Sequence, residues 1–295
     1  MPPAGQDRWF LPAGTSRSGD FCVLLSAADC GWSYSSLRVL ELPLGGVVSL
    51  HTGYDEMLVL PLSGSCTVTV DEHEFALDGR RDVFSGVTDF AYAPRDAQLS
   101  VRSLAGGRFA LPGARAQRRL PARYAPADGV PVEIRGAGQM TRQVNNFCSP
   151  EAFEADRLVA VEVLTPAGNW SSYPPHKHDE DRPGEAVLEE IYYFEVAESL
   201  TGPGVGYQRV YSSSPSKPID VLAEIRSGDV VLVPHGYHGP SMATPAHDLY
   251  YLNVLAGPAP VRTMAFCDDP AYAWIRQSWA SQQTDSRLPM TSSEE

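Results

Sequence analysis

The chain has 295 residues, of which 43% are hydrophobic and 20% charged, and its formal net charge is −13. This length allows one large or two modest domains, and 25 glycines with 25 prolines favour a turn-rich β protein. The acidic balance argues against nucleic acid as a partner, and the absence of any run of eighteen apolar residues argues against a membrane span.

Short β-rich runs bounded by Gly, Pro and Asp recur along the chain, a pattern typical of sandwiches and barrels. In chain order, the clearest expected strands are 21–26, 37–42, 57–62, 66–70, 158–164 and 249–255. Helical periodicity is convincing only near residues 272–281. The segment 282–295 is polar and is expected to be a disordered tail. The predicted fold class is therefore all-β with little helix.

The start of the chain and its cysteines bear on the cellular compartment. The first eight residues lack an apolar core and do not predict a signal peptide. Five cysteines are scattered without a CxxC pair, at positions 22, 30, 66, 148 and 267. An odd and scattered set predicts reduced, packed thiols, and with them a cytoplasmic protein.

The two halves of the chain have the pattern of a diverged duplication. The first half runs from His51 to Glu56 and an apolar run, and the second runs from a histidine pair to Glu190 and another apolar run. Each half then shows an Asp-Val pair and a strand that ends in proline. We therefore predict two tandem barrels, an N-terminal one over residues 1–115 and a C-terminal one over residues 116–281.

A candidate metal site lies in the second half. His176 and His178 occur at i and i+2, a spacing that places both side chains on one face of a strand. Glu190 opens an apolar run, and His238 follows a buried-strand pattern that ends in a Pro/Gly turn. Three imidazoles and one carboxylate inside a barrel form a mononuclear metal site with an open coordination position. Lys177, between the two histidines, should point away from the metal.

One divalent metal ion is therefore the expected cofactor. Zinc is the first choice, but three nitrogens and one oxygen also suit manganese, iron or nickel. The first half offers only His51 and Glu56 at ligand positions, which is too few for a tight site, so we expect that barrel to be degenerate and structural. No Gly-rich dinucleotide fingerprint follows a strand, so no nicotinamide cofactor is expected.

These features match the bicupin architecture, two jelly-roll β-barrels in tandem. Longer and more specific similarity is carried by the segments 171–179, 188–193, 206–211, 232–238 and 248–258. They resemble the 5-deoxy-glucuronate isomerase family of myo-inositol catabolism, which is related to the 5-keto-4-deoxyuronate isomerases. The resemblance covers nearly the whole chain. It implies an aldose–ketose isomerisation between 5-deoxy-D-glucuronate and 2-deoxy-5-keto-D-gluconate (5-dehydro-2-deoxy-D-gluconate).

The implied substrate is a small anionic sugar acid, which the acidic chain would have to bind through local arginines. Arg209 lies on a β-run where an inward arginine is costly unless paired, so it is either an outward surface residue or the clamp for the substrate carboxylate. Tyr192 shares the inward face with Glu190 and either lines the pocket or is a core aromatic. Tyr251 and Asn253, near the end of the barrel, are further pocket candidates. The spacing identifies no general base.

Two other charged features are expected to lie outside the site. Four arginines between residues 115 and 123 form the main basic cluster, and a solvated connector between the barrels is preferred over a binding patch. Glu189 is out of phase with Glu190 and is expected on the outer surface.

Other functions stay open at this point. Cupins with three histidines and a glutamate also act as metal-dependent oxygenases, and a related isomerase could act on another uronate. A sugar-binding or storage bicupin without catalytic activity is a third alternative. Turnover without oxygen consumption would separate the first of these from an isomerase. Assembly into a homo-oligomer is also left open.

Overall fold

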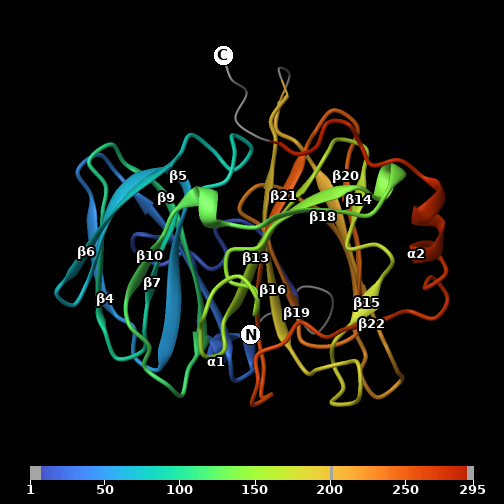
Figure 1. Ribbon diagram of the computed structural model, residues 1–295, viewed down its shortest axis with the longest axis horizontal. Helices are drawn as coiled ribbons and strands as arrows, with labels where there is room; N and C mark the ends of the chain where they lie inside the picture. The colour runs from blue at the N-terminus through green and yellow to red at the C-terminus, as the bar shows by residue number, and fades with distance from the viewer. Residues whose placement is uncertain (1–7, 200–201, 291–295) are drawn as a thin grey trace.

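A computed structural model describes residues 8–199 and 202–290 of the chain (Figure 1). The described residues form two curled β units that lie side by side, with the N-terminal half in blue to green and the C-terminal half in yellow to red. The helices are few and short, which confirms the predicted all-β fold class. In the described part of the chain, no helix has the length and apolar character that a membrane crossing requires.

The N-terminal barrel is built around one long strand. β5 (Asp55–Val70) pairs in its first half with β7 and β9 and in its second half with β6 and β8, so it passes from one sheet to the other. The main sheet has the order β10-β7-β5-β9-β3-β2, and β4 closes the barrel by pairing with β8. The other strands are β2 (Phe21–Leu25), β3 (Ser35–Leu42), β4 (Val47–His51), β6 (His73–Arg80), β7 (Phe90–Ala93), β8 (Gln98–Arg102), β9 (Gly107–Arg115) and β10 (Arg123–Ala125).

The C-terminal barrel has two sheets that face each other. The first has the order β1-β19-β16-β21-β13-β12-β11, and the second has the order β18-β17-β20-β15-β22, with β14 paired to β20. The strands of the first sheet are β1 (Phe10–Leu11), β11 (Val132–Arg135), β12 (Arg142–Asn145), β13 (Val159–Thr165), β16 (Glu189–Val196), β19 (Val230–Val233) and β21 (Leu249–Ala256). Those of the second are β14 (Trp170–Ser171), β15 (His176–Lys177), β17 (Gly206–Tyr211), β18 (Asp220–Ile225), β20 (Tyr237–Ala243) and β22 (Cys267–Asp268).

Alternation along the strands gives each central sheet an inner face toward its own barrel and an outer face toward the other barrel. On β16, Tyr192 and Phe194 fill the interior of the C-terminal barrel. Ile191 and Tyr193 instead join Leu58 of β5 in the largest apolar cluster, which lies between the two barrels. The first half of β5 and the strand β16 are therefore buried on both faces, and this is why each contains a continuous apolar run.

Each barrel takes in a strand from the other side of the expected boundary at residue 115. β1, near the start of the chain, pairs with β19 of the C-terminal barrel. β10, which follows the boundary, pairs with β7 of the N-terminal barrel. The C-terminal barrel is therefore built from two separate stretches of the chain, whereas the strands of the N-terminal barrel, β2 to β10, follow one another in sequence. The connector with its four arginines is part of this exchange, and Arg118 pairs there with Asp156 at 2.7 Å.

The described helices are α1 (Ala27–Cys30), η2 (Ala127–Gly129), η3 (Gly138–Met140), α2 (Ile275–Ser278) and η4 (Trp279–Ser281). α2 and η4 lie within the helical segment predicted near residues 272–281. The tail differs from the predicted disordered segment over residues 282–290. The backbone N–H of Met290 donates to the Gln143 side chain at 2.7 Å, and Asp285 accepts from Asn169 at 2.9 Å. Residues 291–295 of the predicted tail lie outside the described residues.

Two glutamates, the buried Glu56 and the half-buried Glu189, link the barrels through backbone N–H groups. Glu56 of the N-terminal barrel accepts from the backbone of residues 156, 157 and 158 at 2.8, 2.5 and 2.7 Å. Glu189 of the C-terminal barrel accepts from the backbone of residues 33, 34 and 35 at 2.7, 2.7 and 2.8 Å. The prediction that Glu189 lies on the outer surface is therefore wrong. Its strand face does point out of its own barrel, but the other barrel covers that face.

Candidate metal centre and substrate cavity

Three strands of the C-terminal barrel position the predicted metal ligands. β15 carries His176 and is followed by His178, β16 carries Glu190 near its start, and β20 carries His238. His176 lies directly opposite His238 in the β15–β20 pair. Glu190 lies opposite Val233, at the end of the strand that leads to His238. This arrangement places His178, Glu190 and His238 together at one end of the barrel, with His176 beside them.

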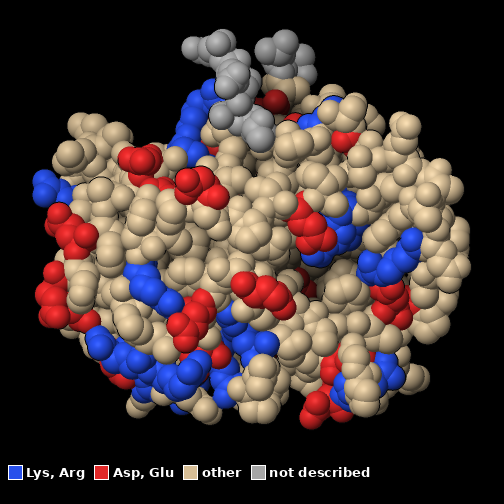
Figure 2. Space-filling view, viewed as in Figure 1, with Lys and Arg blue, Asp and Glu red and all other residues tan. Residues whose placement is uncertain are grey.

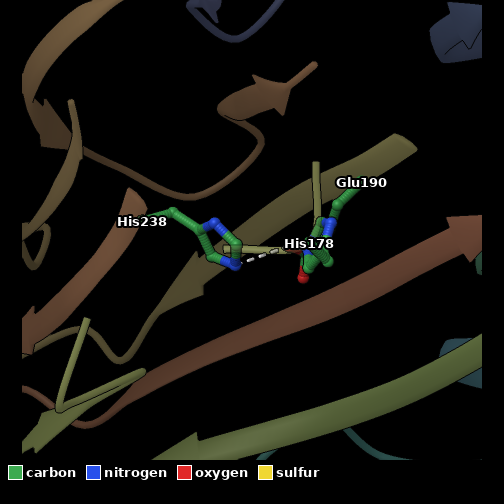
Figure 3. A group of neighbouring side chains, drawn as sticks. All are labelled: His178, Glu190 and His238. Carbon is green, nitrogen blue, oxygen red and sulfur yellow. Dashed lines mark hydrogen bonds and ion pairs between the residues drawn. The ribbon is translucent and has the colours of Figure 1, made fainter. Parts of the chain in front are cut away.

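His178, Glu190 and His238 form a buried cluster whose candidate ligand atoms all lie within 4.8 Å of one another. Figure 3 shows these three side chains pointing toward one another. The Oε2 atom of Glu190 lies 2.9 Å from Nε2 of His178 and 3.0 Å from Nε2 of His238. His176 lies beside this group, with its ring centroid 4.5 Å from that of His238, and it borders the cavity described below.

The imidazoles are oriented by backbone carbonyls. Nδ1 of His176, His178 and His238 lies 3.3, 3.0 and 3.3 Å from the carbonyl oxygens of Pro174, Leu188 and Gly236, respectively. A carbonyl can only accept a hydrogen bond, so each Nδ1 carries a proton, and in the neutral imidazole Nε2 then presents a lone pair. This second hydrogen bond is the usual way in which a metal-binding histidine is held in one tautomer.

The cluster has the donor set that a cation needs. Nε2 of His238 is buried and has no aligned hydrogen-bond partner among the described residues, although Glu190 is close. With Nδ1 protonated, the lone pairs of two imidazoles and a carboxylate oxygen converge, and such an arrangement is repulsive without a positive charge between them. Three nitrogens and one oxygen suit a divalent first-row metal ion, so the residues present fit the predicted cofactor.

The charges in the cluster favour an ionised glutamate. Burial alone would raise the pKa of Glu190, but positive charge on the adjacent imidazoles of His238 and His178, with their hydrogen bonds, outweighs it and holds that pKa far below its usual range. Burial lowers the pKa of His176, and the neighbouring His238 lowers it further, so this imidazole is neutral at pH 7. A neutral imidazole and an ionised carboxylate are the forms that bind a metal.

Lys177 points away from the cluster, as predicted, and organises the segment behind it. Its buried ammonium group lies 2.7 Å from both Asp179 and Glu185. Asp179 also accepts from the backbone N–H of Gly236 at 2.9 Å, two residues before His238. The ion-pair group therefore connects the strand of the first two histidines to the turn that positions the last one.

We expect Asp179→Ala to weaken metal binding about tenfold, because substitution of residues that hold metal ligands in place typically costs about 10–100-fold in affinity. The variant loses the contacts of Asp179 with Lys177 and Gly236, so the His238 turn is no longer fixed. Competition with a metal-sensitive dye measures the affinity. Asp220→Ala is the matched control, because this exposed carboxylate pairs with Arg209 away from the cluster. Equal affinity of the two variants would contradict the prediction.

The N-terminal barrel has no equivalent cluster among its described residues. Met57 lies opposite Ala93, just as Glu190 lies opposite Val233. Ala93 and Val233 are equivalent positions, since each is followed by a proline. Met57, not Glu56, therefore occupies the position of Glu190 and packs in the apolar barrel interior. The prediction that Glu56 occupies a ligand position is therefore wrong, because the equivalent position is one residue later. A shift of one residue moves a side chain to the opposite face of the sheet.

Two connected cavities lead to the cluster. The inner cavity, of about 70 Å³, is lined by His176, His178 and Glu190 together with the predicted pocket residues Tyr192, Tyr251 and Asn253. The outer cavity, of about 540 Å³, opens to the surface. Both cavities share the lining residues Arg135, Arg142, His176, Met264 and Phe266. Figure 2 shows basic side chains beside a hollow on the right-hand half of the molecule, over the C-terminal barrel.

Hydroxyl groups line the inner cavity opposite the arginines. The Ser172 hydroxyl lies 3.2 Å from the Tyr192 hydroxyl and 3.1 Å from the Tyr251 hydroxyl. Burial raises the pKa of both phenols, so they stay protonated at neutral pH and can donate hydrogen bonds. The side-chain amide nitrogen of Asn253 is buried without a hydrogen-bond partner among the described residues. The structure thus brings Tyr192, Tyr251 and Asn253 to the metal cluster.

Arg209 does not reach this cavity. It lies on β17 next to the inward-facing Gln208 and Val210, and its guanidinium pairs with Asp220 on the outer face of the barrel. It lines a separate surface groove with Trp170. Of the two alternatives drawn from the sequence, the outward position is the one observed. The carboxylate clamp has to be sought elsewhere, because adjacent strand residues point to opposite faces.

The arginines at the cavity were missed by sequence reasoning. Arg135 lies on the edge strand β11, Arg142 on the neighbouring strand β12, and Arg276 on α2. One local signal was available. Arg142 and Val144 lie two residues apart and so share a strand face, and the Val144 side chain packs in the barrel interior. No strand was predicted there, so this alternation was not recognised.

Comparison with known proteins identifies a family and named relatives. A family model described as the KduI/IolB family matches residues 9–275. A protein of Geobacillus kaustophilus named 5-deoxy-glucuronate isomerase is 39% identical over 276 residues, which are 92% of this chain and 96% of that protein. A Bacillus subtilis protein of the same name is 37% identical over 254 residues, or 85% of this chain and 91% of that protein.

Solved structures confirm the fold. An IolB-like protein from Salmonella typhimurium superimposes with a TM-score of 0.82 at 32% identity, over 90% of this chain and 98% of that chain. An oxalate decarboxylase of Lactobacillus farciminis matches with a TM-score of 0.59 at 12% identity, over 83% of this chain and 82% of that chain. The second likeness shows the fold alone, and it establishes the predicted bicupin architecture.

Proposed function

The chain belongs to the KduI/IolB family, and from this membership we propose that it is a metal-dependent 5-deoxy-glucuronate isomerase of myo-inositol catabolism. The reaction converts 5-deoxy-D-glucuronate to 2-deoxy-5-keto-D-gluconate. The observation that carries the proposal is the buried group of His178, Glu190 and His238, with the half-buried His176 beside it, at an arginine-lined cavity. That arrangement suits a small sugar acid with a carbonyl at one end and a carboxylate at the other.

One divalent ion per chain is proposed at His176, His178, Glu190 and His238. When bound, it supplies Lewis-acid stabilisation of the negative charge that isomerisation develops on the two reacting oxygens. Zinc remains the first choice among the four candidate metals, and elemental analysis of the purified protein decides between them. The five cysteines are all free, which supports the proposed cytoplasmic location.

The residues of the cavity orient the substrate and keep water away. The hydroxyls of Tyr192, Ser172 and Tyr251 form a connected chain beside the cluster, and the amide of Asn253 offers a donor. These groups hydrogen-bond sugar oxygens at fixed positions, which lowers the entropic barrier to reaction. Apolar lining by Phe266 and other residues excludes water and strengthens the electrostatic interactions inside.

We expect purified protein with a divalent ion to convert 5-deoxy-glucuronate reversibly, without nicotinamide, flavin or oxygen. NMR of the substrate and product follows the reaction, and an oxygen electrode runs in parallel. A chelator should abolish turnover and added metal should restore it. Oxygen uptake in step with turnover would indicate an oxygenase instead. Conversion of another uronate but not of this one would leave an isomerase with a different substrate.

The route of the migrating hydrogen can be predicted from the inner cavity. Among its described lining residues, Glu190 is the one carboxylate, and it is held in the metal cluster. The phenols of Tyr192 and Tyr251 stay protonated, so the lining offers no free base. We therefore expect the C2 hydrogen to move to C1 with its electron pair, while a hydroxyl proton passes from O2 to O1. In D₂O the new CH₂OH carbon should then carry no deuterium. Deuterium there would instead indicate an enediol and a base.

A further inference from the structure

Arg142 is a buried cation that has no carboxylate partner. Its side chain lines both cavities, the residue is 5% exposed, and its hydrogen bond goes to the backbone carbonyl of Met140 at 3.1 Å. Among the described residues, no carboxylate lies within ion-pair distance of it. The neighbouring Arg135 and Arg276, in contrast, have their own partners. A buried, unpaired charge is unfavourable, so its presence at a cavity points to a ligand of opposite charge.

The strand register makes the unpaired charge more costly. Arg142 of β12 lies directly opposite Arg135 of β11, and like charges directly opposite each other destabilise an antiparallel pair. The Arg135 charge is offset by Glu133, at 2.6 and 2.8 Å. Burial, together with the guanidinium groups of Arg135 and Arg276, lowers the pKa of Arg142 to about 10, so it remains charged at pH 7. An anion at this position would offset the repulsion.

The place of Arg142 fits the distal end of a bound sugar acid. With His176, it is one of the residues shared by the inner and the outer cavity, so it lies where the path to the metal cluster narrows. The ring of Trp279 packs against its guanidinium, with 5.4 Å between the guanidinium carbon and the ring centroid. This contact restrains the planar group before a ligand binds, which favours two parallel hydrogen bonds to a carboxylate.

We propose that Arg142 binds the carboxylate of the substrate and selects sugar acids over neutral sugars. This inference rests on the proposed isomerase function for the identity of the substrate, but the anion site itself does not depend on the reaction. With the carboxylate at Arg142, the carbonyl end of the molecule extends toward His178 and Glu190. Arg142 is then the clamp that was sought at Arg209.

The test compares Arg142→Met and Arg142→Lys with Arg209→Met as the matched control. The control removes the same group from the outer face of the barrel, where it pairs with Asp220. Calorimetric titration of each metal-loaded protein with glucuronate and with glucose measures the anion site without turnover. We expect Arg142→Met to weaken glucuronate binding about 100-fold and to leave glucose binding unchanged. Arg142→Lys should recover only part of the loss, because lysine lacks the planar fork.

Turnover gives the second readout. With 5-deoxy-glucuronate, Arg142→Met should lower kcat/KM about 100-fold, whereas the corresponding sugar with a neutral carboxamide should react equally well with both proteins. Metal content and melting temperature show whether the variant is folded, and Arg142→Lys keeps the test decisive if the methionine variant is not.

Wild-type affinity for glucuronate in either Arg142 variant would overturn the proposal, as would an equal loss for the acid and the neutral compounds. If the wild-type protein does not convert 5-deoxy-glucuronate but its glucuronate binding depends on Arg142, the result supports the anion site and contradicts only the proposed reaction.

Discussion

Glu190→Gln is expected to lose the bound metal ion and, with it, all measurable isomerase activity. Glutamine keeps the size of the side chain but removes the negative charge that His178 and His238 face at 2.9 and 3.0 Å. Substitution of residues that only hold metal ligands in place already costs about 10–100-fold in metal affinity. The loss of a ligand itself should therefore weaken metal binding by more than this. Elemental analysis after gel filtration measures one ion per chain in the wild type and none in the variant.

His51→Ala is the control for this experiment. The histidine is exposed in the N-terminal barrel, at the position where the sequence pattern placed a vestigial ligand. We expect this variant to retain one ion per chain and full activity, because the interior of that barrel is apolar. Two tightly bound ions per wild-type chain, or full metal content in Glu190→Gln, would contradict a single site in the C-terminal barrel.

Arg80→Met is expected to destabilise the protein by about 3–5 kcal/mol, the usual cost of leaving one partner of a buried ion pair uncompensated. Arg80 of the N-terminal barrel pairs with Glu162 of the C-terminal barrel, and their side chains are 3% and 0% exposed. Glu162 also accepts from the Tyr250 hydroxyl at 2.8 Å and from Asn145 at 3.1 Å. Urea denaturation measures the loss in the free energy of unfolding.

The double variant Arg80→Met/Glu162→Gln tests the cause. Glutamine can still accept from Tyr250 and Asn145 but carries no charge, so we expect the double variant to be more stable than Arg80→Met alone. Arg17→Met is the exposed control, because Arg17 and Glu41 are 54% and 51% exposed and such pairs contribute about 0–1 kcal/mol. A double variant no more stable than Arg80→Met would show that the buried charge is not what destabilises it.

The strand positions of the proposed metal ligands could be predicted from the sequence because they depend on local geometry. His176 and His178 share a strand face with Lys177 on the other, and this follows from the two-residue period of any β-strand. His238 follows a strand of four buried residues that ends at a Pro/Gly turn. The convergence of these segments required only that the strands form one barrel, which the all-β pattern already indicated.

The tertiary structure decided which strand faces are covered and which charges meet. Alternation indicates that Glu189 points out of its barrel, but only the packing of the two barrels covers that face. The same packing pairs both Glu189 and Glu56 with backbone N–H groups of the other barrel. Arg209 and Arg142 are both arginines on strands. Arg209 forms a surface ion pair with Asp220 of the neighbouring strand. Arg142 is an unpaired buried charge, because the register of β11 with β12 places it opposite Arg135 and beside the cavity. Local sequence determines the period of a strand, whereas the partner of each face is set by contacts between residues that lie far apart in the chain.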